Sequence, residues 1–250
     1  MLRCLTAGES HGPALTAILE GVPAGLRLSE EDVNRELRRR QKGFGSGGRM
    51  RIERDQVRFC GGVLNGQTTG APIGMEIKNR DYANWRDKEI RPMTTPRPGH
   101  ADLTGAIKYG YRELRLALER ASARETAARV AVGAISRRLL AEFSISVGGY
   151  VVQIGEVGAL LPDDLGYPDR FALAEENDVR CPDLDAAEAM RACIREAMAA
   201  KDTLGGVFEI VALGLPPGRG SPDHWERRRY ARRMAPVGSS PPDKGVEIAP

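Results

Sequence analysis

The 250-residue sequence has 37 basic and 34 acidic residues, a formal net charge of +3, and 41% hydrophobic residues. These proportions are those of a globular, soluble protein, and the charge is too small to indicate a nucleic-acid-binding protein by itself. Arginine makes up 31 of the 37 basic residues. Arginine suits bidentate contacts to phosphate and carboxylate groups, although a GC-rich genome produces the same bias.

The cysteines form no C-x-x-C pair and no cluster with histidine. Neither a disulfide framework nor a metal site is therefore expected. The N-terminal residues lack the apolar run of a signal peptide, and no segment offers about eighteen uninterrupted apolar residues. We expect a cytoplasmic protein that neither crosses nor binds a membrane.

Two short strands are predicted at the N-terminus, over residues 2–7 and 14–22. The turn between them carries Ser10 and His11 between glycines, next to a glutamate. Connections on a rigid scaffold often carry functional groups, and this one offers protons and hydrogen bonds. An ordinary hairpin tip explains the turn equally well.

A helix is predicted from Ser29 to about Arg40, where three arginines complement the helix dipole. The loop that follows, residues 43–49, formally matches G-x-G-x-x-G. A dinucleotide-binding fingerprint follows a strand and begins a helix, whereas this loop follows a helix and precedes a predicted strand from Met50 to Glu53. We therefore reject a Rossmann fold and expect the loop to fold over an anionic ligand.

Residues 57–63 and 72–78 are predicted strands of a meander, with Asn65-Gly66 as the turn. Residues 79–98 form a long polar segment without periodicity, which favours an active-site loop. This loop leads to the second candidate histidine.

His100 is predicted to lie in a rigid turn. Two prolines surround Arg97, and Gly99 is able to adopt a positive φ angle. A fixed loop of this kind suits a proton-transfer group. A lone histidine in a loop is more often a solvated surface residue, so the interpretation depends on its combination with the next motif.

Ser122 and Glu125 predict a capping box at the start of a helix that runs to about Phe143. Free backbone N–H groups at such a start favour an anion, and Arg120 and Arg124 flank it. A capping box usually serves only its helix. Together with His100, however, it indicates an enzyme that acts on a small polyanionic substrate.

The predicted helix at 122–143 is small or apolar on nearly every side and should be buried on more than one face. A strand at 145–157, a helix at 184–200 and a strand at 207–213 follow. Helices between runs of antiparallel strands predict an α+β layered fold, a single domain without an internal linker. The arginine-rich residues 224–233 are expected to be a solvated helix rather than a nucleic-acid patch, and residues 246–250 a strand.

Taken together, eight motifs resemble those of the chorismate synthase family, in the family's order. They are AGESHG at 7–12, RRQ at 39–41, GGRM at 47–50, RPGHAD at 97–102, KYG at 108–110, LERASARETAARVA at 118–131, DTLGG at 202–206 and KGVEI at 244–248. The resemblance implies a β-α-β layered sandwich with a helical layer between antiparallel sheets, assembled as a homotetramer.

The activity that the resemblance implies is that of a carbon-oxygen lyase. It converts 5-enolpyruvylshikimate 3-phosphate to chorismate and phosphate in aromatic amino acid biosynthesis, the last step of the shikimate pathway. The cofactor implied is reduced FMN, with NADPH as its reductant in bifunctional flavoproteins of the family. The partners implied are this small substrate and other copies of the chain, with no nucleic acid.

The resemblance also assigns roles to residues. His11 would protonate the departing phosphate, and His100 would set the protonation of the reduced flavin ring. Arg120, Ala121 and Ser122 would contact the flavin. The substrate would be held by Ser10, Arg40, Arg97 and Arg124. We expect the two imidazoles and these guanidinium groups to converge on one pocket.

The sequence departs from the family in three places. Ser46 occupies the position of a family arginine that is linked to anion and NADPH binding. Residues 222–243 break the family's apolar pattern, including a second flavin contact near Pro241-Pro242. Family chains also continue beyond Pro250, so we expect a C-terminally incomplete chain with little turnover of its own. A catalytically inactive fragment, or a non-enzymatic anion-binding or assembly protein of the same fold, is the alternative.

Overall fold

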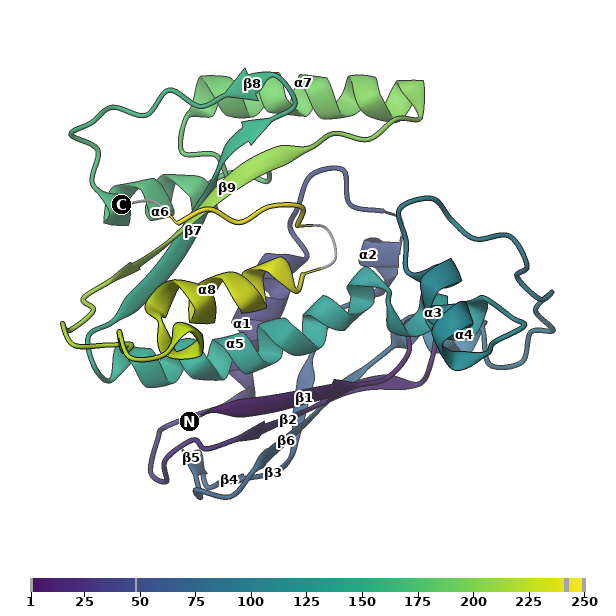
Figure 1. The fold of residues 1–250 in the computed structure, drawn as a ribbon, viewed down its shortest axis with the longest axis horizontal. Coiled ribbons are helices and arrows are strands. Elements are labelled where there is room, and N and C mark those ends of the chain that lie inside the picture. Colours follow the sequence, from purple (N-terminus) through teal and green to yellow (C-terminus); the bar gives the residue numbers. More distant parts are fainter. Residues whose placement is uncertain (1, 48, 241–242, 249–250) are drawn as a thin grey trace.

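A four-stranded antiparallel sheet forms the base of the molecule (Figure 1). In the computed structural model, which describes residues 2–47, 49–240 and 243–248, its strands are ordered β1-β2-β6-β3. Their bounds are β1 (Arg3–Ala7), β2 (Ala14–Glu20), β3 (Val57–Gly61) and β6 (Ile73–Lys78). The strands predicted at 2–7, 14–22, 57–63 and 72–78 are confirmed, with shorter ends. The short hairpin β4 (Val63–Leu64) and β5 (Gln67–Thr68) turns at Asn65-Gly66, both with positive φ angles, as predicted.

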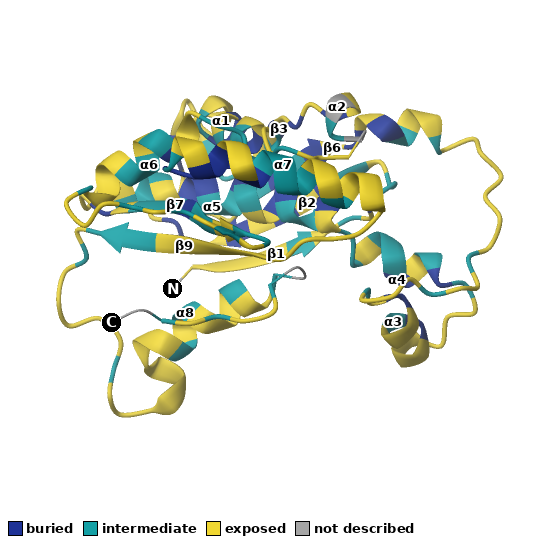
Figure 2. Cartoon of the chain, turned by 90° about the horizontal axis from the view of Figure 1, so that it is seen from above, coloured by how far each residue is buried: buried dark blue, intermediate teal, exposed yellow. Residues whose placement is uncertain are grey.

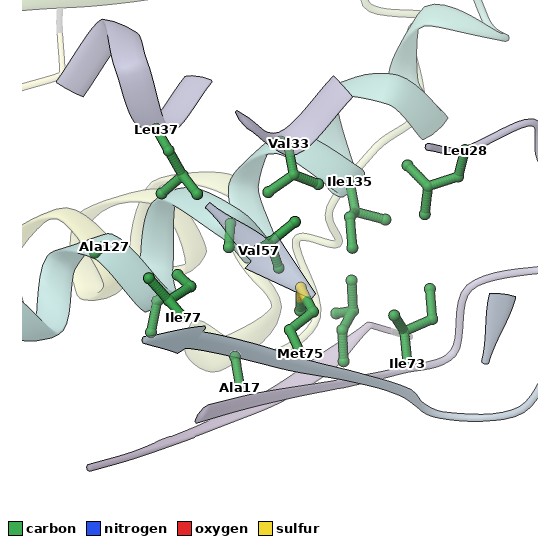
Figure 3. Packing of buried hydrophobic residues seen from close by; sticks show 14 of the residues in the cluster. Ala17, Leu28, Val33, Leu37, Val57, Ile73, Met75, Ile77, Ala127 and Ile135 are labelled. Atoms are coloured by element: carbon green, nitrogen blue, oxygen red, sulfur yellow. The ribbon is translucent and has the colours of Figure 1, made fainter. Parts of the chain in front are cut away.

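Helices α1 (Glu30–Arg40) and α5 (Thr126–Ala141) cover one face of this sheet. Alternate residues of β2 and β6 point toward them, so that one face of each strand is buried and the other is exposed. Figure 3 shows the resulting core, in which Val33 and Leu37 of α1 meet Ile73, Met75 and Ile77 of β6. The core therefore fixes α1 and α5, whose ends carry several candidate site residues.

A second sheet has the order β8-β7-β9 and is also antiparallel. It consists of β7 (Ser146–Ile154), β8 (Val157–Gly158) and β9 (Gly206–Leu213). Helices α6 (Tyr167–Glu175) and α7 (Leu184–Ala200) pack against it, and α5 contacts β7. The α+β class is thereby confirmed, with α1 and α5 between the first sheet and strands β7 and β9 in Figure 1.

The remaining elements are short helices and 3-10 turns. They are α2 (Arg49–Ile52), the 3-10 turn η1 (Arg80–Asn84), α3 (Asp102–Tyr109), α4 (Arg115–Arg120), η2 (Ala123–Glu125), η3 (Trp225–Arg227) and α8 (Arg229–Gly238). Figure 2 shows α3, α4 and α8 away from the buried centre. Helix α8 has no buried residue, which confirms a solvated helix in the arginine-rich region. Among the described residues no helix is long and apolar enough to cross a membrane.

Three predictions of elements were wrong. Met50 to Glu53 is not a strand, because its first residues form the single helical turn α2 and the pattern is too short to separate the two periodicities. Residues 246–248 form no strand, and 249–250 lie outside the described residues. The prolines 162, 168 and 182 predict a loop between the strand at 145–157 and the helix at 184–200, but this stretch holds α6. Pro168 occupies the first turn of α6, where a helix tolerates proline.

Candidate functional site

The chain from Glu119 to Thr126 lies at the centre of the candidate site, and we call it the 119–126 segment. It runs from the end of α4 through η2 to the start of α5. Its side chains and carbonyls contact β1, the turn after β1, the last residue of α1, and the chain just before β3. Residues far apart in the sequence therefore meet along eight consecutive positions.

His11 is held by Glu119. Its Nδ1 lies 2.8 Å from Oε1 and 2.9 Å from Oε2 of that carboxylate. The backbone N–H of His11 donates to Oε2 at 2.7 Å, and the N–H of Ser10 donates to the Glu119 carbonyl at 3.0 Å. The ring of Trp85 lies against the imidazole, with 4.4 Å between centroids. Both candidate residues of the β1–β2 turn are thus fixed to the end of α4.

The predicted capping box is wrong. Ser122 accepts a hydrogen bond from the N–H of Arg124 and begins the 3-10 turn η2, so α5 starts only at Thr126. The Glu125 carboxylate does not return to Ser122, because it accepts hydrogen bonds from Thr6 Oγ1 at 2.7 Å and Arg129 Nε at 2.8 Å. Tertiary partners have replaced the local cap.

Arg124 is buried and faces acidic and polar groups. Its Nη1 donates to Asp55 Oδ1 at 2.6 Å, and its Nε donates to Asn79 Oδ1 at 2.8 Å. Glu53 Oε2 lies 3.8 Å from Nη2. Nη2 itself makes no hydrogen bond with the described residues. Arg124 was expected at an open anion site, but it lies in a buried ionic cluster in which its Nη2 makes no hydrogen bond with the described residues.

Arg40 approaches the same cluster from the end of α1. Its Nε donates to Thr126 Oγ1 at 3.0 Å, and its Nη2 donates to the Ala123 carbonyl at 3.2 Å. Its Nη1 lies 3.5 Å from Asp55 Oδ2. Asp55 thus stands between two of the arginines that the sequence analysis assigned to the substrate.

Arg120 projects from the same segment toward β1. Its Nη2 donates to the carbonyl and the hydroxyl of Thr6, at 2.8 and 2.9 Å. The Arg120 side chain is exposed, and Ala121 and Ser122 beside it are half-buried.

His100 belongs to a second cluster, at the start of α3. Its Nδ1 lies 2.5 Å from Oδ1 of the buried Asp102, and its Nε2 lies 2.9 Å from Arg97 Nη2. Arg97 also donates to Asp102 from its backbone N–H and from Nε. Gly99 has φ 67°, as expected for the turn. Burial alone raises the pKa of Asp102, but the Arg97 hydrogen bonds and the His100 charge outweigh it and hold that pKa below its usual value.

The two histidine clusters are linked through packing of α3 against α4. A cavity of about 410 Å³ adjoins the His11 turn and is lined by Pro13, Asn79, Arg80 and their neighbours. A second, of about 510 Å³, lies between α1, α5, β7 and α6, remote in the fold from both histidines. Neither histidine is among the described residues that line either cavity. Convergence of the two imidazoles on one pocket stays a prediction.

The glycine loop is only partly described, since Gly48 lies outside the described residues. The N–H of Phe44 donates to the Asp178 carbonyl at 2.9 Å, and its side chain packs against a buried cluster that includes Ala187 and Met190 of α7. This part of the loop is therefore anchored toward α7. Pro241 and Pro242, the expected second flavin contact, also lie outside the described residues.

Sequence reasoning missed the carboxylates of the site. Glu53, Asp55, Asp102 and Glu119 each face a candidate histidine or arginine. Asp102 follows His100 by two positions, so its spacing was a usable signal. Glu119 and Asp55 gave no local signal, because their partners lie 108 and 69 positions away.

Comparison with known proteins agrees with the family resemblance of the eight sequence motifs. A chorismate synthase family model matches residues 2–249. Chorismate synthase of Rubrobacter xylanophilus is 53% identical over 254 residues, covering 97% of this chain and 64% of that protein. That of Aquifex aeolicus is 49% identical, covering 99% and 66%. A crystal structure of chorismate synthase has a TM-score of 0.78 at 44% identity, covering 94% of this chain and 63% of that one.

The chain thus spans about two thirds of the length of these relatives. Within that span the identity is well above the level at which a shared family is in doubt, and the match runs along nearly the whole chain. The chain belongs to the chorismate synthase family.

Proposed function

We propose that this chain serves the chorismate synthase reaction. The reaction is the anti-1,4-elimination of phosphate from 5-enolpyruvylshikimate 3-phosphate, which gives chorismate in the shikimate pathway. The observation that carries the proposal is the arrangement around the 119–126 segment. There a histidine paired with a carboxylate lies in the same network as Arg40, Arg120 and Arg124.

The substrate carries a phosphate and two carboxylates, which match a site rich in guanidinium groups. Ser10, Arg40, Arg97 and Arg124 are the residues we propose to hold them. Arg124 Nη2 supports this role, because it is a buried donor with no hydrogen bond to the described residues. A buried donor left unsatisfied costs free energy that an anionic oxygen of the substrate would recover.

His11 is the residue we propose to protonate the departing phosphate. Its Nδ1 faces Glu119, so the proton passed to the substrate is one that Nε2 has first taken up. His100 is proposed to exchange a proton with the cofactor ring. Its Nε2 accepts a hydrogen bond from the Arg97 guanidinium, so this nitrogen becomes available to take up and return a proton when Arg97 turns toward a substrate anion.

The residues proposed to hold the cofactor, reduced FMN, are Arg120, Ala121 and Ser122. They fit an anionic group, because Arg120 offers an exposed guanidinium that donates only through Nη2 to the described residues. The bound cofactor would supply an electron transiently and take it back, with no net redox change. The chain's own contribution is to bind, orient and protonate. We further propose a cytoplasmic homotetramer as the working form.

An assay of a chimaera tests the proposal. Residues 1–213 of this chain, up to the end of β9, replace the matching region of the Rubrobacter chorismate synthase. With dithionite-reduced FMN the chimaera is expected to release phosphate and form chorismate. His11→Ala and His100→Ala in the chimaera should each lower the rate by about 100-fold or more, while both variants stay folded.

The unmodified Rubrobacter protein is the positive control, and the 250-residue chain alone is assayed in parallel. A folded but inactive chimaera beside an active Rubrobacter protein would overturn the proposal. Equal rates for the parent chimaera and both histidine variants would overturn it as well.

A further inference from the structure

We infer that Glu119 is a positioning residue for His11. Its carboxylate fixes the imidazole in the tautomer that carries the proton on Nδ1 and makes Nε2 the nitrogen that exchanges protons. The catalytic meaning of this tautomer rests on the proposed function, whereas the tautomer itself follows from the contacts alone.

The hydrogen-bonding chemistry of the two groups allows one arrangement. An ionised carboxylate only accepts hydrogen bonds. His11 Nδ1 lies 2.8 and 2.9 Å from the two Glu119 oxygens, so Nδ1 must be the donor. In neutral histidine the second nitrogen is then unprotonated, which identifies Nε2 as the basic atom.

Glu119 also binds the backbone of the β1–β2 turn. Oε2 also accepts the backbone N–H of His11 at 2.7 Å, and the Glu119 carbonyl accepts the N–H of Ser10 at 3.0 Å. One residue of α4 therefore fixes both the position of the turn and the orientation of its ring. A side chain that served only to neutralise charge would not need these backbone contacts.

Burial strengthens the pair. The side chains of Glu119 and His11 are 10% and 25% exposed. Arg115, one helical turn earlier, lies 3.9 Å from Oε1, so the Glu119 charge has a cationic neighbour besides His11. Trp85 covers the ring at 4.4 Å between centroids. In such a poorly solvated site a charge-assisted hydrogen bond is stronger than at the surface.

His100 shows the same orientation by an independent contact. A guanidinium group only donates, so Arg97 Nη2 at 2.9 Å requires His100 Nε2 to accept, and the ring proton is on Nδ1 beside Asp102. In His100 the carboxylate comes from the same turn. The carboxylate that contacts His11 comes from 108 positions away, so the His11 tautomer depends on the tertiary fold.

Nitrogen NMR of the 250-residue chain tests the inference without any turnover. The chain has three histidines, which are assigned with the His11→Ala, His100→Ala and His224→Ala variants. Spectra are recorded near pH 8, above the ordinary histidine pKa of about 6.5. Long-range proton–nitrogen spectra then show which ring nitrogen of each histidine carries the proton. The exposed His224 is the internal reference.

In the wild-type chain His11 is expected in the Nδ1–H form. Glu119→Gln replaces the charged carboxylate by a neutral amide with a single acceptor oxygen, so the charge-assisted bond to Nδ1 is lost. The ratio of Nδ1–H to Nε2–H should then fall by about tenfold or more. Glu113→Gln, two residues before α4 begins, is the matched control, because Glu113 pairs with Arg115 at 3.4 Å. It should leave His11 unchanged.

A second variant guards against misfolding. Glu119→Leu removes every acceptor, and the His11 ratio should approach that of His224; the His100 signals serve as a check that the fold around α3 persists. An Nε2–H form in the wild-type chain, or an unchanged ratio in Glu119→Gln, would overturn the inference. An inactive chimaera with the expected tautomer would instead refute only the proposed function.

Discussion

The side chain of Arg124 is only 5% exposed. Arginine is rarely buried to this extent unless its charge is paired. Taking charges out of water costs several kcal/mol for each ion, and ion pairs recover that cost only with good geometry. Asp55 provides a short contact, but Asp55 Oδ2 and Arg124 Nη2 make no hydrogen bond with the described residues. The cost of burying this guanidinium is therefore only partly offset by its neighbours among the described residues.

The carboxyl of Asp102 gives a prediction about pH. Its pKa is lowered, because the Arg97 hydrogen bonds and the His100 charge outweigh the effect of burial. A lowered pKa contributes stability that is present above the unfolded-state pKa of about 3.9 and is lost as the pH falls through the folded-state value. Asp102→Asn should therefore cost about 1.5–3 kcal/mol at pH 6, and this cost should shrink below about pH 4.

Urea unfolding of both proteins between pH 3 and pH 6 measures the difference. Asp87→Asn is the control, because Asp87 is exposed in its pair with Arg86 and should change little at any pH. A cost of Asp102→Asn that is the same at both ends of the range would contradict the assigned cause.

At the scale of single residues, the sequence singled out histidines and arginines but did not indicate which groups surround them in the fold. His100 was placed in its turn because two prolines restrict the backbone locally and Gly99 permits a positive φ angle. Arg124 was expected to be open to a ligand, yet it is buried, because Asp55 and Asn79 approach it from elements that only the tertiary fold brings near. Partners separated by long loops leave no periodic trace in a single sequence.

Among the elements, α7 depends on a single capping residue. Asp183 accepts hydrogen bonds from the N–H groups of Asp185 and Ala186 at the helix start, and from Leu160 in the preceding loop. These bonds lower the pKa of Asp183. Asp183→Ala should destabilise the chain by about 1 kcal/mol, with an upper bound near 2, seen as a lower urea midpoint.

The control for Asp183 is Asp163→Ala, in the exposed loop between β8 and α6 that also holds Leu160. Asp163 makes no hydrogen bond or ion pair with the described residues, so its removal is expected to shift the midpoint by less than about 0.5 kcal/mol. If both variants lower the urea midpoint equally, the hydrogen bonds of Asp183 contribute no more to stability than an exposed surface charge does.

The same contrast explains which elements could be predicted. Helix α1 was placed correctly because Ser29 forms a local capping box with Asp32. At Ser122 the same type of motif was misleading, because Thr6 and Arg129 bind Glu125 instead. Local signals hold where no tertiary partner competes for the same group. The helices α3 and α4 were missed, since neither has a side-chain cap.

For the molecule as a whole, the two sheets differ in how well they are covered. In the first sheet one face of β2 and β6 is packed by α1 and α5. The second ends in β9, and in the described part of the chain no strand pairs with its outer edge. Val207, Phe208 and Ile210 of β9 are each about half exposed, at 52%, 47% and 57%. Figure 2 shows most of this strand as exposed.

An uncovered apolar edge strand presents unpaired backbone groups and is a template for pairing with another chain. The 250-residue chain should therefore self-associate as its concentration rises. Phe208 and Ile210 lie on one face, since side chains alternate along a strand. Replacing both with lysine should raise the concentration at which light scattering begins. Leu160→Lys, in a loop at 86% exposure, is the matched control. If it suppresses scattering as strongly, general charge rather than β9 governs the association.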